Sequence, residues 1–357
     1  MSEEKQRLVV VTWSGLTKYA VCCLKEYIRQ TTDRVVVISR RTRFPAEGLE
    51  ASLGKPVIWV DDADPRPLVD VVGSLPKVLV ASGWDSACFL RWAKEVKAAG
   101  GRTIVTPDEA WMGWSMKEML RMIRWRVRFN RLYDKVFCCG AGGRRLFRFY
   151  GVSDNRISEG AYAADPTIFY DGKPLPLREK KMIYVGQLNE RKNVMRMVEA
   201  FCKVSESCPG WKLEIYGAGP LEEDLTHLAA GSDNISVRGY VQTDQLGDLY
   251  RSAQIFVLGS LQENWGVVVH EAALCGCLLL LSNRVGAAAD FSAPQNSAIF
   301  NPLSVFEFTS AMERLMSFPD EEKVVGQKSS VELARKFSPA FFASQMEKMV
   351  DELRRGN

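Results

Sequence analysis

Two glutamates eight positions apart mark the stretch of this chain best suited to chemistry. Glu263 and Glu271 stand in the sequence GSLQENWGVVVHEAALCGC, residues 259–277. The apolar run at 255–258 predicts a buried parallel strand, and the Ala-rich segment 267–275 predicts a helix. Glu263 is then expected at the carboxyl end of a strand, where open α/β sheets bind ligands, and Glu271 on the helix that follows.

A glycine between the two acids completes this motif. Gly266 lets backbone amides near the start of the helix face an anionic group. Two carboxylates that can bind hydroxyl groups, with backbone amides between them that can bind a phosphate, predict a binding site for a nucleotide sugar. A strand, a turn and a helix with two incidental acids is the alternative. The order of apolar strand, Ser260, Glu, aromatic residue, Gly, apolar run and second Glu favours the functional interpretation.

This order of residues resembles the E-x7-E motif of retaining glycosyltransferases of family 4. The resemblance extends over most of residues 8–345 and is strongest in 181–291. It implies the GT-B fold class, in which two α/β Rossmann-like domains with parallel sheets face each other across a cleft and a C-terminal helix crosses back to the N-domain. It also implies that Glu271 binds ribose hydroxyls. The sugar hydroxyls would be bound by Glu263 and by the amides around Trp265, Gly266 and Val267.

A second motif, YVGQLNERKN, follows a predicted strand and precedes a predicted helix. Gly186 gives a tight turn there, and Arg191 and Lys192 offer positive charge to a diphosphate. Asn193 is expected to cap the next helix. Family members usually have Arg where this chain has Gln187, so one phosphate cation is missing and Arg191 is expected to compensate. An ordinary surface turn is the alternative.

Three weaker signals add donor contacts. Gly217, in YGAGP, ends a strand but lacks the further glycine of a dinucleotide fingerprint, and a plain turn is equally compatible. Tyr240, in RGYV, resembles the segment whose backbone reads the base, which leaves uracil and guanine both open. Gly15, in the turn TWSGL, aligns with the family's glycine-rich loop near the donor phosphates, where a helix start can contact an oxyanion.

An acid is the candidate for the sugar-facing group of the N-domain. The resemblance implies a histidine at the end of one N-domain strand, but here that strand ends Thr-Pro-Asp-Glu. Asp108 is therefore the first candidate and Glu109 the second, although Asp108 could instead cap a helix or hold a loop. Of the two histidines, His227 is expected in solvent and His270 turned away from the ligand. The predicted catalytic set is Asp108, Lys192 and Glu263.

No metal and no cofactor beyond the donor are expected. The sequence Asp62-Ala63-Asp64 resembles the metal site of the other glycosyltransferase fold, GT-A, but it lies in a Pro-flanked loop of what resembles a GT-B N-domain. The nine cysteines have no metal-binding spacing and indicate a reducing cytosol. No apolar run reaches the ~18 residues of a membrane span. The charged N-terminal MSEEKQR is not expected to be a secretory signal.

Strand and helix patterns alternate along the chain, which predicts two doubly wound parallel sheets. At 357 residues two domains are expected. A linker is predicted at 171–179, which has two prolines and a glycine, so the predicted parts are 1–172, 173–337 and a C-terminal helix over 338–357. The predicted strands are Leu8–Thr12, Arg34–Ser39, Pro56–Val60, Lys77–Ser82, Thr103–Thr106, Lys135–Cys139, Met182–Val185, Trp211–Tyr216, Ile235–Arg238, Gln254–Leu258 and Cys277–Ser282.

The first half of the chain is basic. Residues 1–176 hold 28 Lys and Arg against 20 Asp and Glu, whereas the remainder holds 19 against 23. This imbalance favours an anionic partner such as a lipid phosphate or a membrane surface. Nucleic acid is not expected, because no zinc-finger, RNA-binding or basic-zipper pattern is present.

The helical segment 116–131 has two apolar faces and an arginine stripe. The face expected to pack on the core holds Met116, Leu120, Ile123 and Val127. The opposite face and the stripe suit docking to an anionic bilayer; burial of both faces is the alternative. The residues predicted to touch the membrane are Arg121, Arg124, Arg128, Trp125 and Phe129.

The function predicted from these residues and the resemblance is retaining transfer of a hexose-type unit from a UDP- or GDP-linked sugar to a glycan or lipid-linked acceptor. Bacterial surface polysaccharide assembly, in the cytoplasm or at the inner face of its membrane, is the expected setting. The resemblance implies that the departing phosphate takes the acceptor proton, so a dedicated base is unnecessary. The alternatives are a hydrolysing or epimerising relative, a non-catalytic sugar-nucleotide sensor or partner, and, less favoured, an NAD-dependent oxidoreductase.

Overall fold

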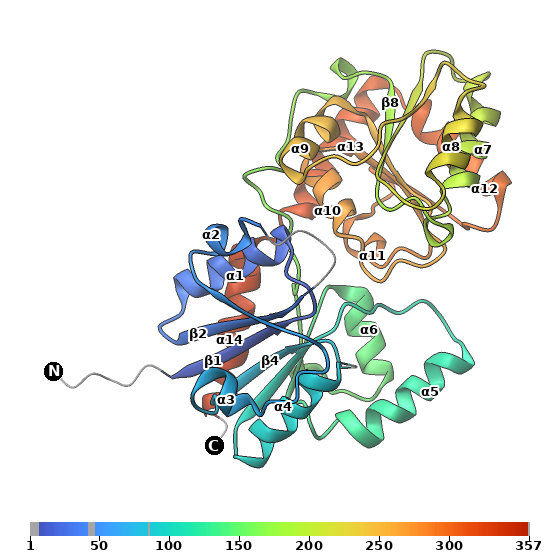
Figure 1. The fold of residues 1–357 in the computed structure, drawn as a ribbon. Helices are drawn as coiled ribbons and strands as arrows, with labels where there is room; N and C mark the ends of the chain where they lie inside the picture. The colour runs from blue at the N-terminus through green and yellow to red at the C-terminus, as the bar shows by residue number, and fades with distance from the viewer. Residues whose placement is uncertain (1–6, 42–46, 85, 356–357) are drawn as a thin grey trace. The chain divides into compact units, whose positions relative to one another are not determined.

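The computed structural model describes residues 7–41, 47–84 and 86–355, and the chain forms two compact units (Figure 1). The first unit combines Met1–Ala163 with Phe337–Asn357, and the second is Ala164–Lys336. Most of the charged N-terminal segment considered as a secretory signal, residues 1–6, lies outside the described part of the chain.

The first unit is built on a parallel sheet whose described strands follow the order β3-β2-β1-β4-β5-β6-β7. Every residue of β1 and β4 is buried, as expected for parallel strands covered by helices on both faces. The strands are β1 Leu8–Trp13, β2 Arg34–Arg40, β3 Val57–Val60, β4 Val78–Ser82, β5 Arg102–Thr106, β6 Lys135–Cys138 and β7 Ile157–Glu159.

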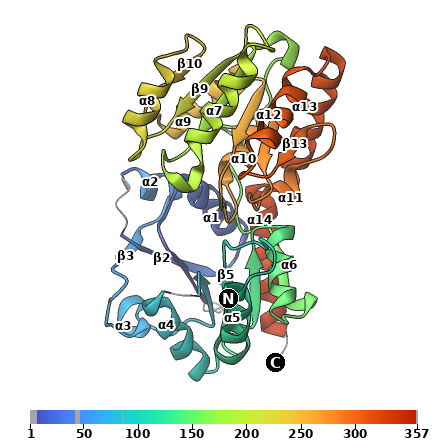
Figure 2. The same cartoon turned by 90° about the vertical axis from the view of Figure 1, so that its right-hand side faces the viewer.

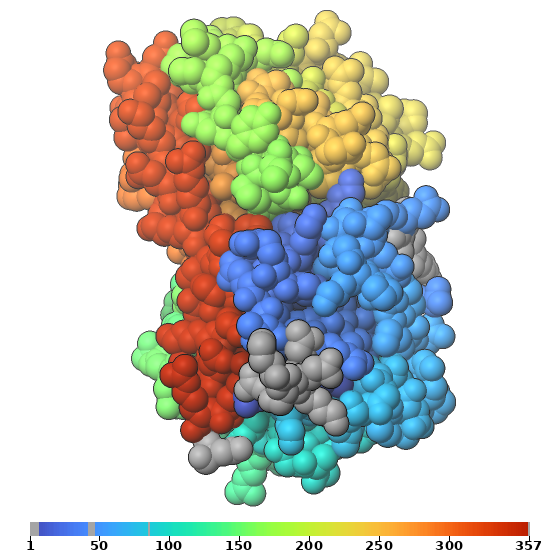
Figure 3. All heavy atoms as spheres, turned by 90° about the vertical axis from the view of Figure 1, so that its left-hand side faces the viewer, coloured from blue at the N-terminus to red at the C-terminus, as the bar shows by residue number. Residues whose placement is uncertain are grey.

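Helices of the first unit come from both ends of the chain. They are α1 Lys18–Gln30, α2 Leu49–Leu53, α3 Leu68–Val72, α4 Ala87–Ala98, α5 Met116–Arg124, the π-helical turn η1 Trp125–Phe129, α6 Ala141–Phe149 and α14 Pro339–Arg355. The C-terminal α14 packs on α1, and the two lie side by side in Figure 3. The ring of Phe342 of α14 also packs, tilted by 39°, against that of Phe137 of β6, with 5.2 Å between the ring centroids. The predicted return of the C-terminal helix to the first unit is confirmed.

The second unit has a parallel sheet of order β10-β9-β8-β11-β12-β13 among its described residues. Helices α7, α8 and α12 lie on one face and α9, α10 and α13 on the other (Figure 1). The strands are β8 Lys181–Val185, β9 Lys212–Tyr216, β10 Ile235–Val237, β11 Ile255–Leu258, β12 Leu278–Ser282 and β13 Ser297–Phe300. The helices are α7 Val194–Ser205, α8 Glu222–Ala229, α9 Thr243–Ser252, α10 Val267–Leu274, α11 Ala288–Phe291, α12 Val305–Met316 and α13 Asp320–Ala334.

Each predicted strand coincides with an observed strand to within one residue at either end. The sequence pattern did not predict β7 and β13, which are three and four residues long. Both are edge strands, with one neighbour each.

The linker predicted at 171–179 is instead part of the second unit, which begins at Ala164 rather than after 172. Leu175 is buried, and its backbone amide donates to Gln327 Oε1 of α13 (2.7 Å). Arg178 is also buried and donates to the carbonyl oxygen of Ala253 (3.2 Å). Prolines and a glycine suggested a free connection, but long-range hydrogen bonds hold this segment against α13 and the end of α9.

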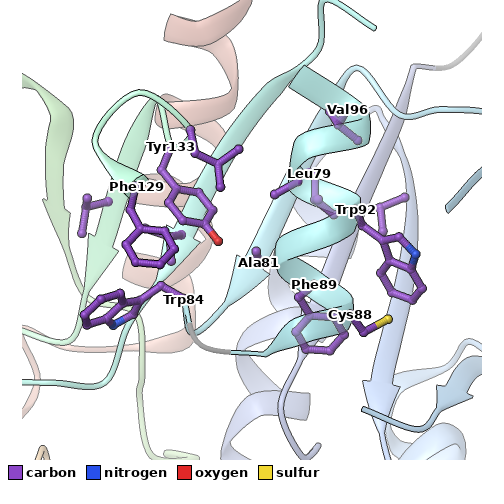
Figure 4. Close-up of a cluster of buried hydrophobic side chains, with 14 of the residues drawn as sticks. Leu79, Ala81, Trp84, Cys88, Phe89, Trp92, Val96, Phe129 and Tyr133 are labelled. Atoms are coloured by element: carbon purple, nitrogen blue, oxygen red, sulfur yellow. The ribbon is translucent and has the colours of Figure 1, made fainter. Parts of the chain in front are cut away.

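A cluster of aromatic rings fills the core of the first unit beside α4 and η1 (Figure 4). Trp84 meets Phe129 edge to face at 5.1 Å and Trp125 at 5.6 Å. Trp125 in turn packs 4.8 Å from Phe147 of α6, which places α5 and η1 beside α6 (Figure 2). Such aromatic pairs contribute stability beyond the area they bury.

In the segment 116–131 the aromatic face is buried, as the alternative to membrane docking had it, and the aliphatic face that was expected in the core is exposed. Trp125 and Phe129 are 0% and 1% exposed, so they cannot face a membrane. The rings of Trp125 and Phe129 fill the space between Trp84 and α6. The aliphatic face of the same segment therefore points outward. The side chains of that outward face, predicted to be core, are 51–78% exposed; they are Met116, Leu120, Ile123 and Val127.

Replacing Trp125 with alanine is expected to lower the free energy of unfolding by about 3–5 kcal/mol, because it leaves a cavity within packed rings. Val127→Ala, on the exposed face of the same turn, is the matched control and should change stability by less than about 0.5 kcal/mol. Urea unfolding followed by circular dichroism measures both. Equal stabilities for the two variants would contradict the assigned orientation.

Candidate functional site

The candidate site of the second unit lies where the order of its strands reverses. From β8 the chain runs outward through β9 to β10 and then returns to β11 on the other side of β8. In open α/β sheets, ligands bind at this switch point, beyond the carboxyl ends of the strands. The loops after β8 and β11 are joined there: the amide of Leu261 donates to the Arg191 carbonyl oxygen (2.8 Å).

Asn193 strengthens this junction in a way the sequence did not predict. Its φ of 58° is left-handed, and its side chain does not cap α7. Instead Nδ2 donates to the carbonyl oxygens of Gly259 (3.1 Å) and Pro302 (3.0 Å). Asn193 therefore occupies the N-cap position of α7 as predicted, but its side chain serves the long-range contact between the loops and makes no capping hydrogen bond to the helix.

Three glycine turns form the rim of the site at the ends of β8, β9 and β10. The amide of Gly186 donates to Tyr216 O (3.0 Å), and that of Gly217 donates to Gly239 O (2.8 Å). A Cβ on Gly217 would overlap the carbonyl oxygen of Gly186, so no larger residue fits there. Tyr240 follows this rim with an exposed ring.

A carboxylate and two cations meet at the centre of the switch point. Glu263 Oε2 accepts hydrogen bonds from Lys192 Nζ, from Arg191 Nη1 (3.2 Å) and from Ser260 Oγ (3.3 Å). Lys192 is buried, and the loss of solvation lowers its pKa, while the charge of Glu263 opposes that shift. Glu263 therefore helps to keep Lys192 protonated, and the three charges sum to +1.

The second glutamate of the motif lies on α10, as predicted. Glu271 is buried, and Oη of Tyr250 on α9 donates to its Oε2 (3.3 Å). Burial raises the pKa of Glu271 to about 7, with a smaller opposing effect from the Tyr250 hydrogen bond. Gly266 begins α10 with a left-handed φ of 90°, which turns the chain from the Glu263 loop into the helix. Val267 is the first residue of that helix, and Trp265 is buried before it.

The loop after β12 supports the first glutamate, a contact that sequence reasoning missed. The Glu263 amide donates to Arg284 O (2.9 Å), and the Gly286 amide donates to Glu263 O (2.9 Å). Glu263 and Val285 thus form an isolated parallel bridge. The only sequence signal for this loop is Gly286 shortly after a strand. Tyr250 and Ser260, which hydrogen-bond the two acids, were not predicted as partners either.

His270 stands beside Glu271 in sequence but serves the core. Its Nδ1 accepts from the amide of Ala164 (3.0 Å), so Nε2 donates to the Ala334 carbonyl oxygen (2.9 Å). The ring stacks on Phe291 at 4.8 Å. His227 is exposed on α8. Both histidines therefore lie as predicted, and His270 has both ring nitrogens engaged.

The first unit has its own switch point, between β1 and β4. Ser14 follows β1 and Ser82 is the last residue of β4, and their Oγ atoms are 2.9 Å apart. Gly15 follows at φ 147°, a conformation that favours glycine. This is the turn that the sequence predicted beside the donor.

The two acids after β5 have different surroundings. Asp108 is exposed, whereas Glu109 is largely buried and accepts from Arg121 Nη2 (2.7 Å) and Trp84 Nε1 (2.8 Å). Burial, reinforced by the charge of Asp108, raises the pKa of Glu109 to about 7. Glu109 thus holds α5 in place, and Asp108 is the acid open to solvent.

The Asp-x-Asp sequence is engaged in structural contacts. Asp62 pairs with Arg40 (2.9 Å) and accepts from Ser86 Oγ (2.8 Å), while Asp64 pairs with Arg66 (2.6 Å). Among the described residues, no group of three or more His, Cys, Asp or Glu side chains could hold a metal ion.

Known structures share this fold over nearly the whole chain. HepE of Anabaena, solved in complex with UDP and glucose, superimposes with a TM-score of 0.73 at 13% identity, over 97% of this chain and 100% of HepE. Sucrose-phosphate synthase of Thermosynechococcus elongatus gives a TM-score of 0.76 at 16% identity, over 99% and 100%. The predicted class, an α/β fold of two Rossmann-like domains of the GT-B kind, is confirmed.

The second unit also matches a sequence family. Residues 169–330 fit the family model described as "Glycosyl transferases group 1". Sulfoquinovosyl transferase SQD2 of Arabidopsis thaliana is 27% identical over 150 residues, 41% of this chain and 28% of that protein. D-inositol 3-phosphate glycosyltransferase of Rhodococcus opacus is 24% identical over 193 residues, 49% of this chain and 43% of that protein. The chain spans 28–53% of the length of the first three curated relatives it matches.

The buried Glu271 is expected to make stability depend on pH. Its folded pKa of about 7 lies above the ordinary glutamate value, so the fold favours the protonated carboxyl. The stabilisation is complete below about pH 4.3 and is lost as pH rises through 7, at up to about 1.4 kcal/mol per pH unit. Glu271→Gln should remove this contribution to the slope between pH 5 and 7. Urea unfolding across that range tests it, with the exposed Glu223→Gln as control; an unchanged slope in Glu271→Gln would contradict the assignment.

Proposed function

We propose that this protein is a retaining glycosyltransferase that moves a hexose-type sugar from a nucleoside diphosphate sugar to a glycan or lipid-linked acceptor. The observation that carries the proposal is the meeting of Lys192, Arg191 and Glu263 at the switch point of the second sheet. Fixed cations at that point suit a diphosphate that gains charge as it leaves. The family match of residues 169–330 supports the same chemistry.

Each site residue has a proposed role in the donor complex. Lys192 and Arg191 neutralise the departing diphosphate, which makes a bound metal ion unnecessary for that task. Glu263 holds Lys192 charged and, with the backbone around Trp265 and Val267, binds the sugar hydroxyls. Glu271 binds the hydroxyl groups of the ribose. The other residues proposed to contact the donor are Gly15, Gly186, Gly217, Tyr240 and Gly266.

In this proposal the acceptor attacks the sugar from the same face that the diphosphate leaves, so the anomeric configuration is retained. The leaving phosphate oxygen takes the proton of the acceptor hydroxyl, so no side chain acts as general base. This agrees with His270, whose two ring nitrogens already bond to backbone groups. Asp108 of the first unit is the proposed polar group that faces the sugar.

A UDP-sugar is the donor we propose first. HepE and another solved relative in fold are described in complex with UDP, UDP-glucose or a fluorinated analogue of it. The proposed setting is surface polysaccharide assembly at the cytoplasmic face of a bacterial membrane. Within the described residues no helix is both long and apolar enough to cross a bilayer.

Calorimetric binding and product release test the proposal together. UDP-glucose, UDP-galactose, UDP-N-acetylglucosamine and GDP-mannose are each titrated into the protein, and free nucleotide is then measured without acceptor. Binding with slow release of UDP or GDP supports a transferase. Binding with no release from any donor supports a non-catalytic partner, an outcome that Gln187 in place of the usual arginine makes worth testing. Binding of none of the four overturns the proposal.

Lys192→Ala is expected to slow nucleotide release about 10²–10³-fold, because it removes a preorganised charge from the leaving diphosphate. The change in melting temperature is measured in parallel to separate catalysis from folding. Lys203→Ala, at an exposed position of α7, is the control and should release nucleotide at the parental rate. A parental rate for Lys192→Ala would refute the proposed role.

The acids after β5 are expected to separate function from stability. Asp108→Asn should retain donor affinity and melting temperature but lose about 10²-fold in transfer, because it removes charge facing the sugar. Glu109→Gln should instead lower the melting temperature, since the ion pair with Arg121 is lost. Loss of transfer in a fully stable Glu109→Gln variant, with Asp108→Asn fully active, would exchange the two roles.

A further inference from the structure

The first unit carries an exposed apolar surface on one helix. The large apolar side chains that are exposed between residues 114 and 127 gather on one side of α5 and η1. We call these residues the outer face of α5; they are Trp114, Met116, Met119, Leu120, Ile123 and Val127. At 100° per residue, the five from Met116 onward fall within about a third of the helix circumference.

Anchors on the opposite side fix this orientation. Trp125 and Phe129 are buried among the rings of the core. Arg121 is bound to Glu109 (2.7 Å), and the Tyr150 hydroxyl donates to Glu118. At the start of the helix, Ser115 Oγ accepts from the Glu118 amide (3.1 Å). The outer face therefore cannot turn inward without breaking the core and these polar contacts.

The exposed charged side chains within residues 111–131 are all positive. An exposed basic stripe runs along one side of it, made of Lys117, Arg124, Arg128 and Arg131. Glu118 is the one acidic residue of the sequence from 111 to 131, and it points into the unit toward Tyr150. The surface thus offers apolar and cationic groups together, without exposed negative charge from this segment.

An aromatic residue marks the amino-terminal end of the outer face. The Trp114 side chain is 75% exposed, yet its ring is braced by Phe149 at 4.9 Å and Trp111 at 5.5 Å. Arg145 lies over the Trp111 ring at 5.4 Å. Tryptophan beside arginine is favoured at the boundary between lipid headgroups and acyl chains.

We propose that the outer face of α5 and its basic stripe dock the protein on an anionic phospholipid bilayer. The apolar side chains enter the headgroup boundary, and the four cations contact lipid phosphates. A segment of this length is too short to span the ~30 Å hydrocarbon core, so the helix lies in the plane of the surface. Arg124 and Arg128 were also predicted from the sequence to touch the membrane, whereas the apolar side chains are those of the face opposite to the predicted one.

Charge argues for lipid rather than for a second copy of this chain. A two-fold dimer through the outer face would bury the same segment of both copies. That segment offers no exposed acid to pair with the basic stripe of its partner. An anionic bilayer supplies the missing negative charge.

Sedimentation with vesicles tests the proposal without any donor, so the result is independent of the proposed transfer reaction. The full chain is mixed with phosphatidylcholine vesicles containing 30% or no phosphatidylglycerol. The parent protein should bind the anionic vesicles at least tenfold more strongly than the neutral ones. The triple variant Leu120→Ser/Ile123→Ser/Val127→Ser should lose at least tenfold in anionic binding, with a melting temperature within about 2 °C of the parent because these side chains are exposed.

Two further variants separate the apolar and charged contributions. Arg128→Gln/Arg131→Gln should weaken anionic binding by about fivefold for each charge removed. Leu303→Ser/Phe306→Ser, at 68% and 78% exposed positions of the second unit, is the matched control and should bind like the parent. Sedimentation velocity of the parent and the triple variant reports on self-association.

Three results would overturn the proposal. The first is a parent protein that does not bind anionic vesicles, and the second is a triple variant that binds them as well as the parent does. The third is a parent that is dimeric in solution and becomes monomeric in the triple variant, which would assign the outer face to a second copy.

Discussion

The ion pair between Lys192 and Glu263 is the interaction on which the second unit's site depends. It connects the loops after β8 and β11, the neighbouring strands at which the strand order reverses. In open α/β sheets the connections that follow two such strands run to opposite sides, and a crevice lies between them. Burying the ammonium group of Lys192 costs free energy unless a negative charge is paired with it, and Glu263 supplies that negative charge. Two hydrogen bonds join the same loops: the Leu261 backbone amide donates to the Arg191 carbonyl oxygen, and the side-chain amide of Asn193 donates to the Gly259 carbonyl oxygen. The charged groups are therefore positioned before any ligand arrives, which is what electrostatic catalysis requires.

The first unit places two adjacent acids in different surroundings just after β5. Asp108 is exposed to solvent, whereas the side chain of Glu109 is largely buried. The inward acid joins Arg121 and Trp84 and so links the sheet to α5. The attachment of α5 to the sheet therefore uses Glu109 and leaves Asp108 exposed.

Most of the fold and much of the candidate site could be predicted from sequence because both depend on local patterns. Buried parallel strands are short apolar runs, and their carboxyl ends fix where Gly186, Lys192 and Glu263 must lie. The faces of α5 could not be predicted this way, since both repeat with the helical period and only the rings around Trp84 select the aromatic one. The predictions of a free linker at 171–179 and of a side-chain cap by Asn193 were incorrect for a related reason, because both the segment and the side chain make their contacts with residues far away in the sequence.

Because α14 belongs to the first unit, that unit is assembled from the two ends of the chain, whereas the second is one continuous segment. During synthesis the surface of α1 stays uncovered until residues 337–357 leave the ribosome, while residues 164–336 can collapse as they emerge. Closing the first unit then joins α1 to a helix some three hundred residues later, the kind of non-local contact that forms slowly. The first unit can therefore be completed only after the whole of the second unit has been synthesised.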